Sequence, residues 1–185
     1  MRFLWAIIFL SLFVLGFFLT SHFLHTKPTE GDYSFKAQSL QGEVSLESFR
    51  GQYVALYFGY TSCPDVCPLT LSTLSRVLNE LDNPAITLLF ISLDPARDEL
   101  ENIDLYVKYF YPPSLGLRVE ERDLAKLAIA YGLKYQRIPL PESKLEYSIA
   151  HSSAVYLFDT RGEFVQAVSN LTYEELKNAL TQLTR

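Results

Sequence analysis

The residues best suited to chemistry are two cysteines four positions apart. Cys63 and Cys67 are the only cysteines of the chain, and they lie in the segment GYTSCPDVCP, residues 59–68. Residues four apart on a helix share one face, with their Cβ atoms about 5–6 Å apart. Two thiols at that separation can close a disulfide or hold one metal ion, so the spacing permits both redox chemistry and metal binding.

The surroundings of the cysteines predict reactive thiols. The pair follows an apolar run at 53–58 and precedes leucines at helical spacing from Leu69 to Leu81, with Pro68 suited to a first helical turn. The start of a helix presents free N–H groups and the positive end of its dipole, which stabilise a thiolate. We therefore expect Cys63 and Cys67 to be partly exposed and to have lowered pKa values.

A distant histidine is the candidate for a third ligand. His151 stands just before an expected strand at 153–158, whose start should face the cysteine turn in a thioredoxin-like sheet. His22 and His25 flank an apolar N-terminal segment and are interpreted as interfacial polar residues.

Two thiols and one imidazole form a donor set that favours copper. Soft thiolate ligands select Cu(I) and zinc, whereas structural zinc usually takes four ligands, and no fourth is evident. Iron–sulfur clusters require more cysteines. One copper ion held by Cys63, Cys67 and His151 is therefore the preferred interpretation, and its one-electron chemistry could cycle with the thiol pair.

Composition limits the class of protein. The chain has 185 residues, 16 Lys and Arg against 21 Asp and Glu, and a net charge of −5. This balance argues against a nucleic-acid partner, because such proteins neutralise phosphates with clustered cations. The apolar share of 49%, with 13 Phe and 12 Tyr, excludes a disordered chain and suits one globular domain.

The N-terminal segment predicts a membrane anchor. Residues 3–24 contain no Asp, Glu, Lys or Arg, and a helix of that length spans about 33 Å, enough to cross a bilayer. No A-x-A-like cleavage site follows, so we expect an uncleaved single-pass anchor at 1–25. Arg2 favours a cytoplasmic N-terminus. The expected location is a bacterial inner membrane with the soluble domain in the periplasm.

The rest of the chain alternates expected strands and helices. A linker at 26–33 precedes a domain at 34–185. Strands are expected at 53–58, 86–93, 153–158 and 164–168, and helices at 69–81, 98–111, 121–131 and 172–183. A strand–helix–strand crossover followed by a hairpin and a terminal helix predicts an α/β, thioredoxin-like fold.

Three sequence blocks resemble the Sco (SenC/PrrC) family of membrane-anchored, thioredoxin-fold copper proteins. The blocks are residues 59–68, the segment SLDPARD at 92–98, and the segment from His151 to Gly162. They occur in the family's order and at suitable spacing. Together with the anchor, the resemblance covers essentially the whole chain.

The resemblance implies a copper site and a partner. It implies that Cys63, Cys67 and His151 bind one copper ion, as Cu(I) or Cu(II), and that the protein assists assembly of the dinuclear copper centre of cytochrome c oxidase subunit II. It names neither a copper donor nor a thiol reductant. One departure is Ala150, where many members carry Asp, and this change would alter support of the imidazole.

Two functions stay open, so whether the protein is an enzyme is undecided. One is a copper metallochaperone that passes its ion to a partner's cysteines. The other is a thiol–disulfide oxidoreductase with Cys63 as the attacking thiolate and Cys67 as the resolving thiol. Thioredoxins hold substrate backbone with a proline where this chain has Ala150 and His151, which disfavours a general reductase. A peroxidase or redox sensor is weaker still.

Two further segments are interpreted as structural. Asp94, Arg97 and Asp98 are expected to form a polar loop and helix cap after the second strand, with a docking edge for a partner as the alternative. The tyrosine-rich run at 106–111 is expected to be a packed helix face.

Overall fold

The computed structural model describes residues 32–185. Within them, Tyr33–Arg185 form one compact unit. The expected anchor at 1–25, with His22 and His25, lies outside the described residues. Among residues 32–185 no helix has both the length and the apolar character needed to cross a membrane.

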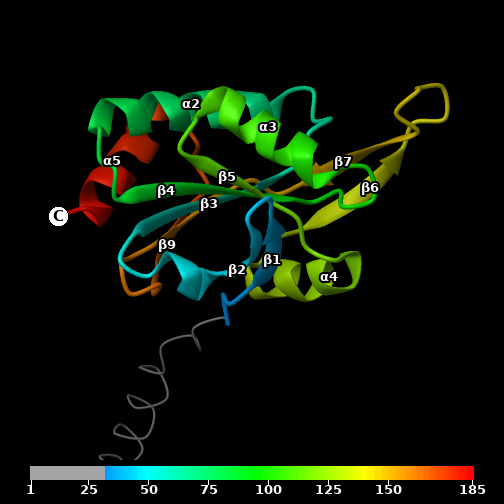
Figure 1. The fold of residues 1–185 in the computed structure, drawn as a ribbon. Helices are drawn as coiled ribbons and strands as arrows, with labels where there is room; N and C mark the ends of the chain where they lie inside the picture. Colours follow the sequence, from blue (N-terminus) through cyan, green and yellow to red (C-terminus); the bar gives the residue numbers. More distant parts are fainter. Residues whose placement is uncertain (1–31) are drawn as a thin grey trace, which may run out of the picture. The chain divides into compact units, whose positions relative to one another are not determined.

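A five-stranded mixed sheet forms the centre of this unit, in the order β5-β4-β3-β8-β9 (Figure 1). The first three strands in this order run parallel, whereas β8 lies antiparallel to β3, and β9 to β8. The strands are β3 (Tyr53–Gly59), β4 (Ile86–Ser92), β5 (Ser114–Leu117), β8 (Val155–Phe158) and β9 (Phe164–Val168). Every residue of β4 is buried, as expected of a strand covered on both faces.

Helices cover both faces of this sheet (Figure 1). Three of them, α2 (Val66–Leu81), α3 (Leu100–Phe110) and α5 (Tyr173–Leu183), lie on one face. The other face carries α4 (Glu121–Ala130) and a hairpin of β1 (Lys36–Ser39) and β2 (Gly42–Ser45), with a short 3-10 helix, η1 (Leu46–Phe49), following it. Helices join β3 to β4 and β4 to β5, so the carboxyl ends of the parallel strands meet at one edge, where open α/β sheets bind ligands.

Aromatic side chains pack on both faces of the sheet. On the α2 and α3 face, the Phe90 ring lies 6.0 Å from Tyr57 and 5.7 Å from Tyr106. On the opposite face, Tyr131 meets Phe58 edge-on at 5.0 Å. Such pairs stabilise by about 0.5–1.5 kcal/mol beyond their burial, and here they hold the strand that leads to the cysteines.

The expected helices and central strands agree with the structure to within a few residues, with one exception in the packing. Tyr106 contacts the core and Tyr111 is buried, but Tyr109 is 83% exposed, so the packed-face interpretation of 106–111 is wrong for Tyr109. A helix has a solvent side, and the run of aromatic residues reaches around to it.

The structure also contains strands that the sequence did not predict. These are the β1–β2 hairpin, β5, and a second hairpin made of β6 (Tyr135–Pro139) and β7 (Tyr147–His151). The β6–β7 hairpin belongs to no larger sheet and projects from the body of the unit (Figure 1). The last residue of β7 is His151, so the histidine belongs to the end of this strand, whereas the sequence placed it only before the strand that is now β8.

Candidate metal and thiol site

The two cysteines lie where β3 passes into α2. The strand ends at Gly59 and the helix begins at Val66, so Cys67 is the second residue of the helix whereas Cys63 lies in the preceding turn. The Cys63 N–H donates to the Tyr60 carbonyl at 3.2 Å, which closes that turn. The cysteines therefore lie at the expected strand-to-helix turn but do not share a helix face, and a hydrogen bond between their side chains affects the pKa of Cys63.

Both thiols are free and buried. Cys63 is 8% exposed and Cys67 is fully inaccessible. The expectation of partly exposed thiols is therefore wrong. Tertiary packing contributes to the burial of Cys67, because its Sγ lies against Gly59 and faces His151 at the end of the β6–β7 hairpin, which the sequence did not predict.

Gly59 makes room for the Cys67 sulfur. A Cβ atom at position 59 would lie 2.9 Å from Cys67 Sγ and 2.8 Å from Phe90 Cε2. Real Cβ atoms do not approach so closely, so the last residue of β3 must lack a side chain if the sulfur and the ring are to keep their places.

Replacing Gly59 with alanine is expected to lower the free energy of unfolding by about 1–3 kcal/mol, the usual cost of overpacking a core. Denaturant unfolding measures this change. Gly42→Ala is the control, because its Cβ would meet nothing within 4 Å, although its φ of +118° adds backbone strain. A Gly59→Ala protein as stable as the wild type would contradict this packing argument.

A buried carboxylate holds the cysteine turn. Asp98 accepts hydrogen bonds from the Thr61 N–H at 3.0 Å, the Thr61 hydroxyl at 2.5 Å and the Ser92 hydroxyl at 2.6 Å. It is 1% exposed. Helix α3 instead has Glu99 as its N-cap, without a side-chain cap bond. The helix-cap interpretation is therefore wrong, and Asp98 ties the turn to the end of β4.

The imidazole of His151 faces the sulfur of Cys67. Its Nε2 lies 3.7 Å from Cys67 Sγ, and its Nδ1 lies 3.0 Å from the Ser152 carbonyl oxygen. A carbonyl can only accept, so Nδ1 carries a proton, and Nε2 is the ring nitrogen that faces the sulfur. Ala150 is exposed, and imidazole support comes from the Ser152 backbone.

Tyr60 joins the cysteine turn to the histidine strand, a role that the sequence did not reveal. Its hydroxyl lies 3.1 Å from Ser148 Oγ and accepts the Ile149 N–H at 3.4 Å. Its ring stands edge-on to His151 with centroids 6.2 Å apart. Tyr60 follows β3 directly, so it fixes β7 against the end of the central sheet.

The two thiols differ in acidity. The pKa of Cys63 is lowered to about 3, chiefly by a hydrogen bond from the Cys67 thiol, with further help from His151 and from the backbone N–H groups of Asp65 and Cys67. The pKa of Cys67 is raised, because its proton is held by Cys63 and because it is buried. The predicted lowering is therefore right for Cys63 and wrong for Cys67, which acts as the donor of the pair.

The rate of alkylation of Cys63 by iodoacetamide is expected to change little between pH 5 and pH 8. An ordinary thiol, with a pKa of about 8.5, gains about tenfold in thiolate per pH unit over that range, whereas a thiol with a pKa of about 3 is already ionised throughout. Mass spectrometry of the copper-free protein measures the rate. In Cys67→Ala the side-chain donor is gone, and the dependence on pH should increase. A tenfold rise per unit in the wild type would contradict this assignment.

The structure brings the three candidate residues together, because Cys63 interacts with both Cys67 and His151, and His151 also faces Cys67. Within residues 32–185 it assembles no group of three or more His, Cys, Asp or Glu side chains that could hold a metal ion as they stand. All three candidates lie at the carboxyl edge of the parallel strands.

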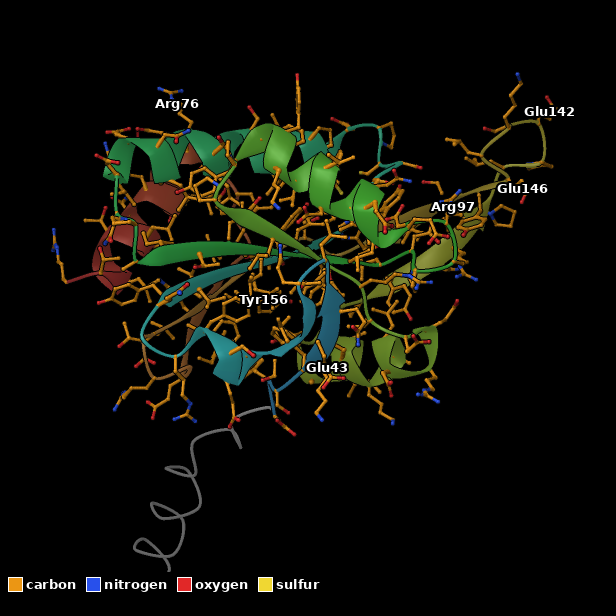
Figure 2. The ribbon with its side chains drawn as sticks, viewed as in Figure 1. Glu43, Arg76, Arg97, Glu142, Glu146 and Tyr156 are labelled. Carbon is orange, nitrogen blue, oxygen red and sulfur yellow. The ribbon has the colours of Figure 1, made fainter. Side chains whose placement is uncertain are left out.

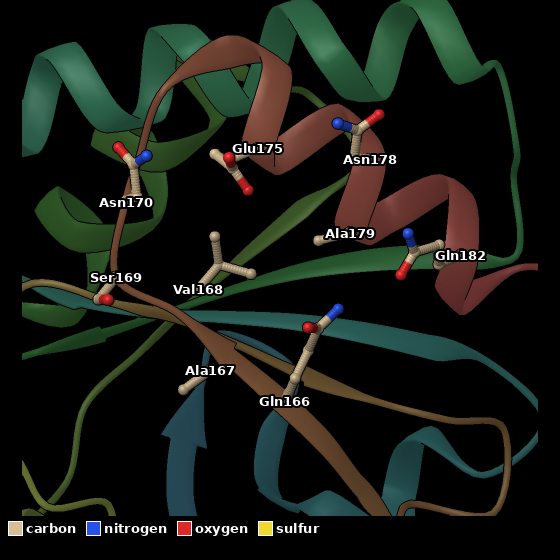
Figure 3. A pocket seen from close by; sticks show the side chains of 9 residues that line it. All are labelled: Gln166, Ala167, Val168, Ser169, Asn170, Glu175, Asn178, Ala179 and Gln182. Carbon is tan, nitrogen blue, oxygen red and sulfur yellow. The ribbon is translucent and has the colours of Figure 1, made fainter.

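A separate pocket of about 260 Å³ lies between β9 and α5 (Figure 3). Four of its nine lining residues carry amide side chains, namely Gln166, Asn170, Asn178 and Gln182. Neither cysteine nor His151 lines it, so it is no part of the thiol site.

Comparisons with known proteins agree on one family. The SCO1/SenC family model matches residues 24–185. The mitochondrial SCO2 homologue of Bos taurus is 37% identical over 145 residues, which are 76% of this chain and 53% of that protein. The chain thus spans about half the length of the curated relatives it matches.

Solved structures show the same fold. Copper-bound ScoI of Arabidopsis thaliana superposes with a TM-score of 0.75 and 28% identity, covering 82% of this chain and 96% of that one. Copper-bound yeast Sco1 superposes with a TM-score of 0.73 and 30% identity, and the match covers 85% of this chain and 89% of that one. The thioredoxin domain of a thiol–disulfide oxidoreductase from Bacteroides vulgatus superposes with a TM-score of 0.60 at 19% identity. The match covers 86% of this chain and all of that one, and it supports the fold alone.

The predicted thioredoxin-like α/β fold is therefore confirmed for the described domain. The resemblance drawn from the three sequence blocks is confirmed as well, because a family model covering most of the chain and relatives above 30% identity agree. This chain belongs to the SCO1/SenC family.

Proposed function

We propose that the protein binds one copper ion through Cys63, Cys67 and His151 and passes it to cysteines of a partner protein. The observation that carries this proposal is the 3.7 Å approach of His151 Nε2 to Cys67 Sγ, between residues 84 positions apart in the chain. Because the fold brings His151 from a distant part of the chain to a buried thiol, the two side chains can serve as ligands of one metal ion.

The chemistry of the three side chains fits copper as cargo. Cys63 supplies a thiolate and His151 an Nε2 lone pair, both donors that copper accepts. Cys67 holds its proton, so copper uptake must release it, and binding strengthens as the pH rises. The Arabidopsis and yeast relatives with copper bound support the choice of metal.

The proposed recipient is subunit II of cytochrome c oxidase, whose dinuclear copper centre the protein would help to assemble. Family membership supports this assignment. A thiolate-rich recipient can take copper by ligand exchange, sulfur by sulfur, without a change of valence. The copper donor and the thiol reductant are left unnamed.

The proposed arrangement in the cell follows from the sequence. An anchor at 1–25 and a linker at 26–33 would hold the domain at 34–185 on the periplasmic side of a bacterial inner membrane. The apolar, uncharged run at 3–24 supports this arrangement.

Competition with a Cu(I) chelator under anaerobic conditions tests the copper proposal. The detergent-solubilised chain should bind one Cu(I), and His151→Ala, Cys63→Ser and Cys67→Ser should each lose at least roughly 100-fold in affinity, since even supporting residues are worth 10–100-fold. Asn178→Ala, in the separate pocket, is the control. Wild-type affinity in His151→Ala would refute the proposed ligand set.

A thiol–disulfide oxidoreductase is the second candidate, favoured by the pairing of a thiolate at Cys63 with a protonated thiol at Cys67. Cys63 would attack a partner disulfide, and Cys67 would displace the partner's thiol. The partner is then reduced by two electrons, and a Cys63–Cys67 disulfide forms. An external thiol must reduce it again. This activity should survive His151→Ala, whereas tight copper binding should not.

A further inference from the structure

His151 is carried by an element that is only loosely part of the main fold. The β6–β7 hairpin pairs with no other strand of residues 32–185 and extends away from the central sheet, with Glu142 and Glu146 near its far end (Figure 2). The place of the imidazole over Cys67 therefore depends on the side chains that fasten the hairpin to the body.

Arg97 fastens the hairpin from the loop after β4. Its Nη1 donates to the carbonyl oxygens of Leu145 at 2.6 Å and Tyr147 at 2.9 Å. The central carbon of its guanidinium lies 3.6 Å from the centroid of the Tyr147 ring. The Arg97 side chain thus contacts both the backbone and the Tyr147 ring at the start of β7. Figure 2 labels Arg97 beside this end of the hairpin.

Asp94 completes the contact. Its Oδ2 accepts from Arg97 Nε at 2.5 Å and its Oδ1 accepts from the Tyr147 hydroxyl at 2.7 Å. The Asp94 side chain is fully buried and that of Arg97 is 23% exposed. Because each oxygen of the buried Asp94 carboxylate accepts from a different donor, the carboxylate fixes Arg97 and Tyr147 relative to each other. A lysine at position 97 would not reproduce this geometry, because its ammonium is flexible and lacks the planar set of donors.

The contacts of Tyr147 determine the orientation of the strand face that also carries His151. Residues two apart on a strand point to the same side, so Tyr147, Ile149 and His151 share one face. Ile149 is buried on that face. Tyr147 and His151 are about 13 Å apart along the strand at the usual rise, so a small tilt at Tyr147 moves the imidazole away from the sulfur.

We propose that Arg97 is a positioning residue, which with Asp94 and Tyr147 sets the β6–β7 hairpin so that His151 Nε2 is directed at Cys67 Sγ. It touches none of the three proposed ligands and acts through the hairpin alone. The inference rests on the proposed function in so far as His151 is taken to be a copper ligand.

The first test uses the copper-free protein and compares Arg97→Lys with Arg118→Lys. Arg118 is also partly buried, but its guanidinium donates to the Pro95 carbonyl in the same loop and not to the hairpin. A nuclear Overhauser effect between the His151 ring and the Cys67 β-protons should be seen in the wild type and in Arg118→Lys, and lost in Arg97→Lys. An effect retained in Arg97→Lys would overturn the proposal.

The second test is a double-mutant cycle on Cu(I) affinity. Arg97→Lys alone should weaken affinity by about 10-fold, the lower end for residues that support a ligand. In a His151→Ala background the same change should have no further effect, because Arg97 acts only through His151. An equal loss in both backgrounds would indicate general destabilisation and overturn the proposal.

The two proposals can fail separately. If His151→Ala keeps wild-type affinity, the copper ligand set is refuted, while the Overhauser effect still decides whether Arg97 positions the ring. If Arg97→Lys does not fold, Tyr147→Phe takes its place, because it removes only the hydroxyl bond to Asp94. That variant should weaken both the Overhauser effect and the affinity, and wild-type values for both would overturn the positioning role of Arg97, Asp94 and Tyr147.

Discussion

Asp98→Ala is expected to lower the free energy of unfolding by about 3 kcal/mol, at the high end for a single substitution. Asp98 is buried and accepts from the Thr61 N–H, the Thr61 hydroxyl and the Ser92 hydroxyl. Alanine leaves all three donors without this acceptor and opens a cavity under the cysteine turn. Denaturant unfolding measures the loss, and faster alkylation of Cys63 should report the loosened turn.

The matched control is Asp123→Ala, which removes an exposed carboxylate paired with Lys126 at 3.4 Å. Surface pairs of this kind contribute about 0–1 kcal/mol. Should Asp98→Ala cost no more than this control, the hydrogen bonds of Asp98 are not what holds the turn, and the structural role assigned to it here is wrong.

Gly116→Ala should be the most damaging small substitution in the domain. A Cβ atom at Gly116 would lie 2.5 Å from both the Cα and the N of Asp104 and 2.7 Å from the Ile103 carbonyl carbon. These are backbone atoms of α3, which cannot move aside as a side-chain end can. We expect a loss above the usual overpacking cost of about 1–3 kcal/mol, because β5 must separate from α3.

Thermal and denaturant unfolding measure this loss. Gly132→Ala is the control, because its φ of +62° strains an alanine although no atom lies within 4 Å of the added Cβ. Backbone strain alone costs about 1–2 kcal/mol. A Gly116→Ala protein as stable as the Gly132→Ala control would contradict the close approach of α3 and β5.

The central layer was predictable because burial leaves a clear pattern. Strands β3 and β4 are buried on both faces and appear in the sequence as near-continuous apolar runs. Helix α5 begins with Thr172 as its N-cap, accepting from the Glu175 N–H, as a threonine before two acidic residues suggests. Local composition determines these elements, so one sequence suffices to find them.

The β6–β7 hairpin was not predictable in this way. Strand β6 is mostly exposed and contains Pro139, which gives neither a buried run nor a clean alternation. What holds the hairpin lies elsewhere in the chain, in Tyr60, Asp94 and Arg97. A short strand fixed by distant polar side chains leaves no local signal in its own residues.

The same tertiary contacts explain the errors at the candidate site. Burial of Cys67 involves the unpredicted hairpin, whose His151 faces the sulfur. The raised pKa of Cys67 follows from its hydrogen bond to Cys63 and from its burial, whereas the start of a helix acts on both thiols alike. Residue types and spacing identified the cysteines and His151 as candidates, and the contacts among them required the fold.

X-ray absorption spectroscopy of the Cu(I)-loaded protein is the most direct test of the proposed site. Each copper should be bound by two sulfur atoms and one imidazole nitrogen, and the nitrogen signal should disappear in His151→Ala. A spectrum with sulfur ligands alone in the wild type, or with an imidazole that persists in His151→Ala, would contradict the proposed ligand set.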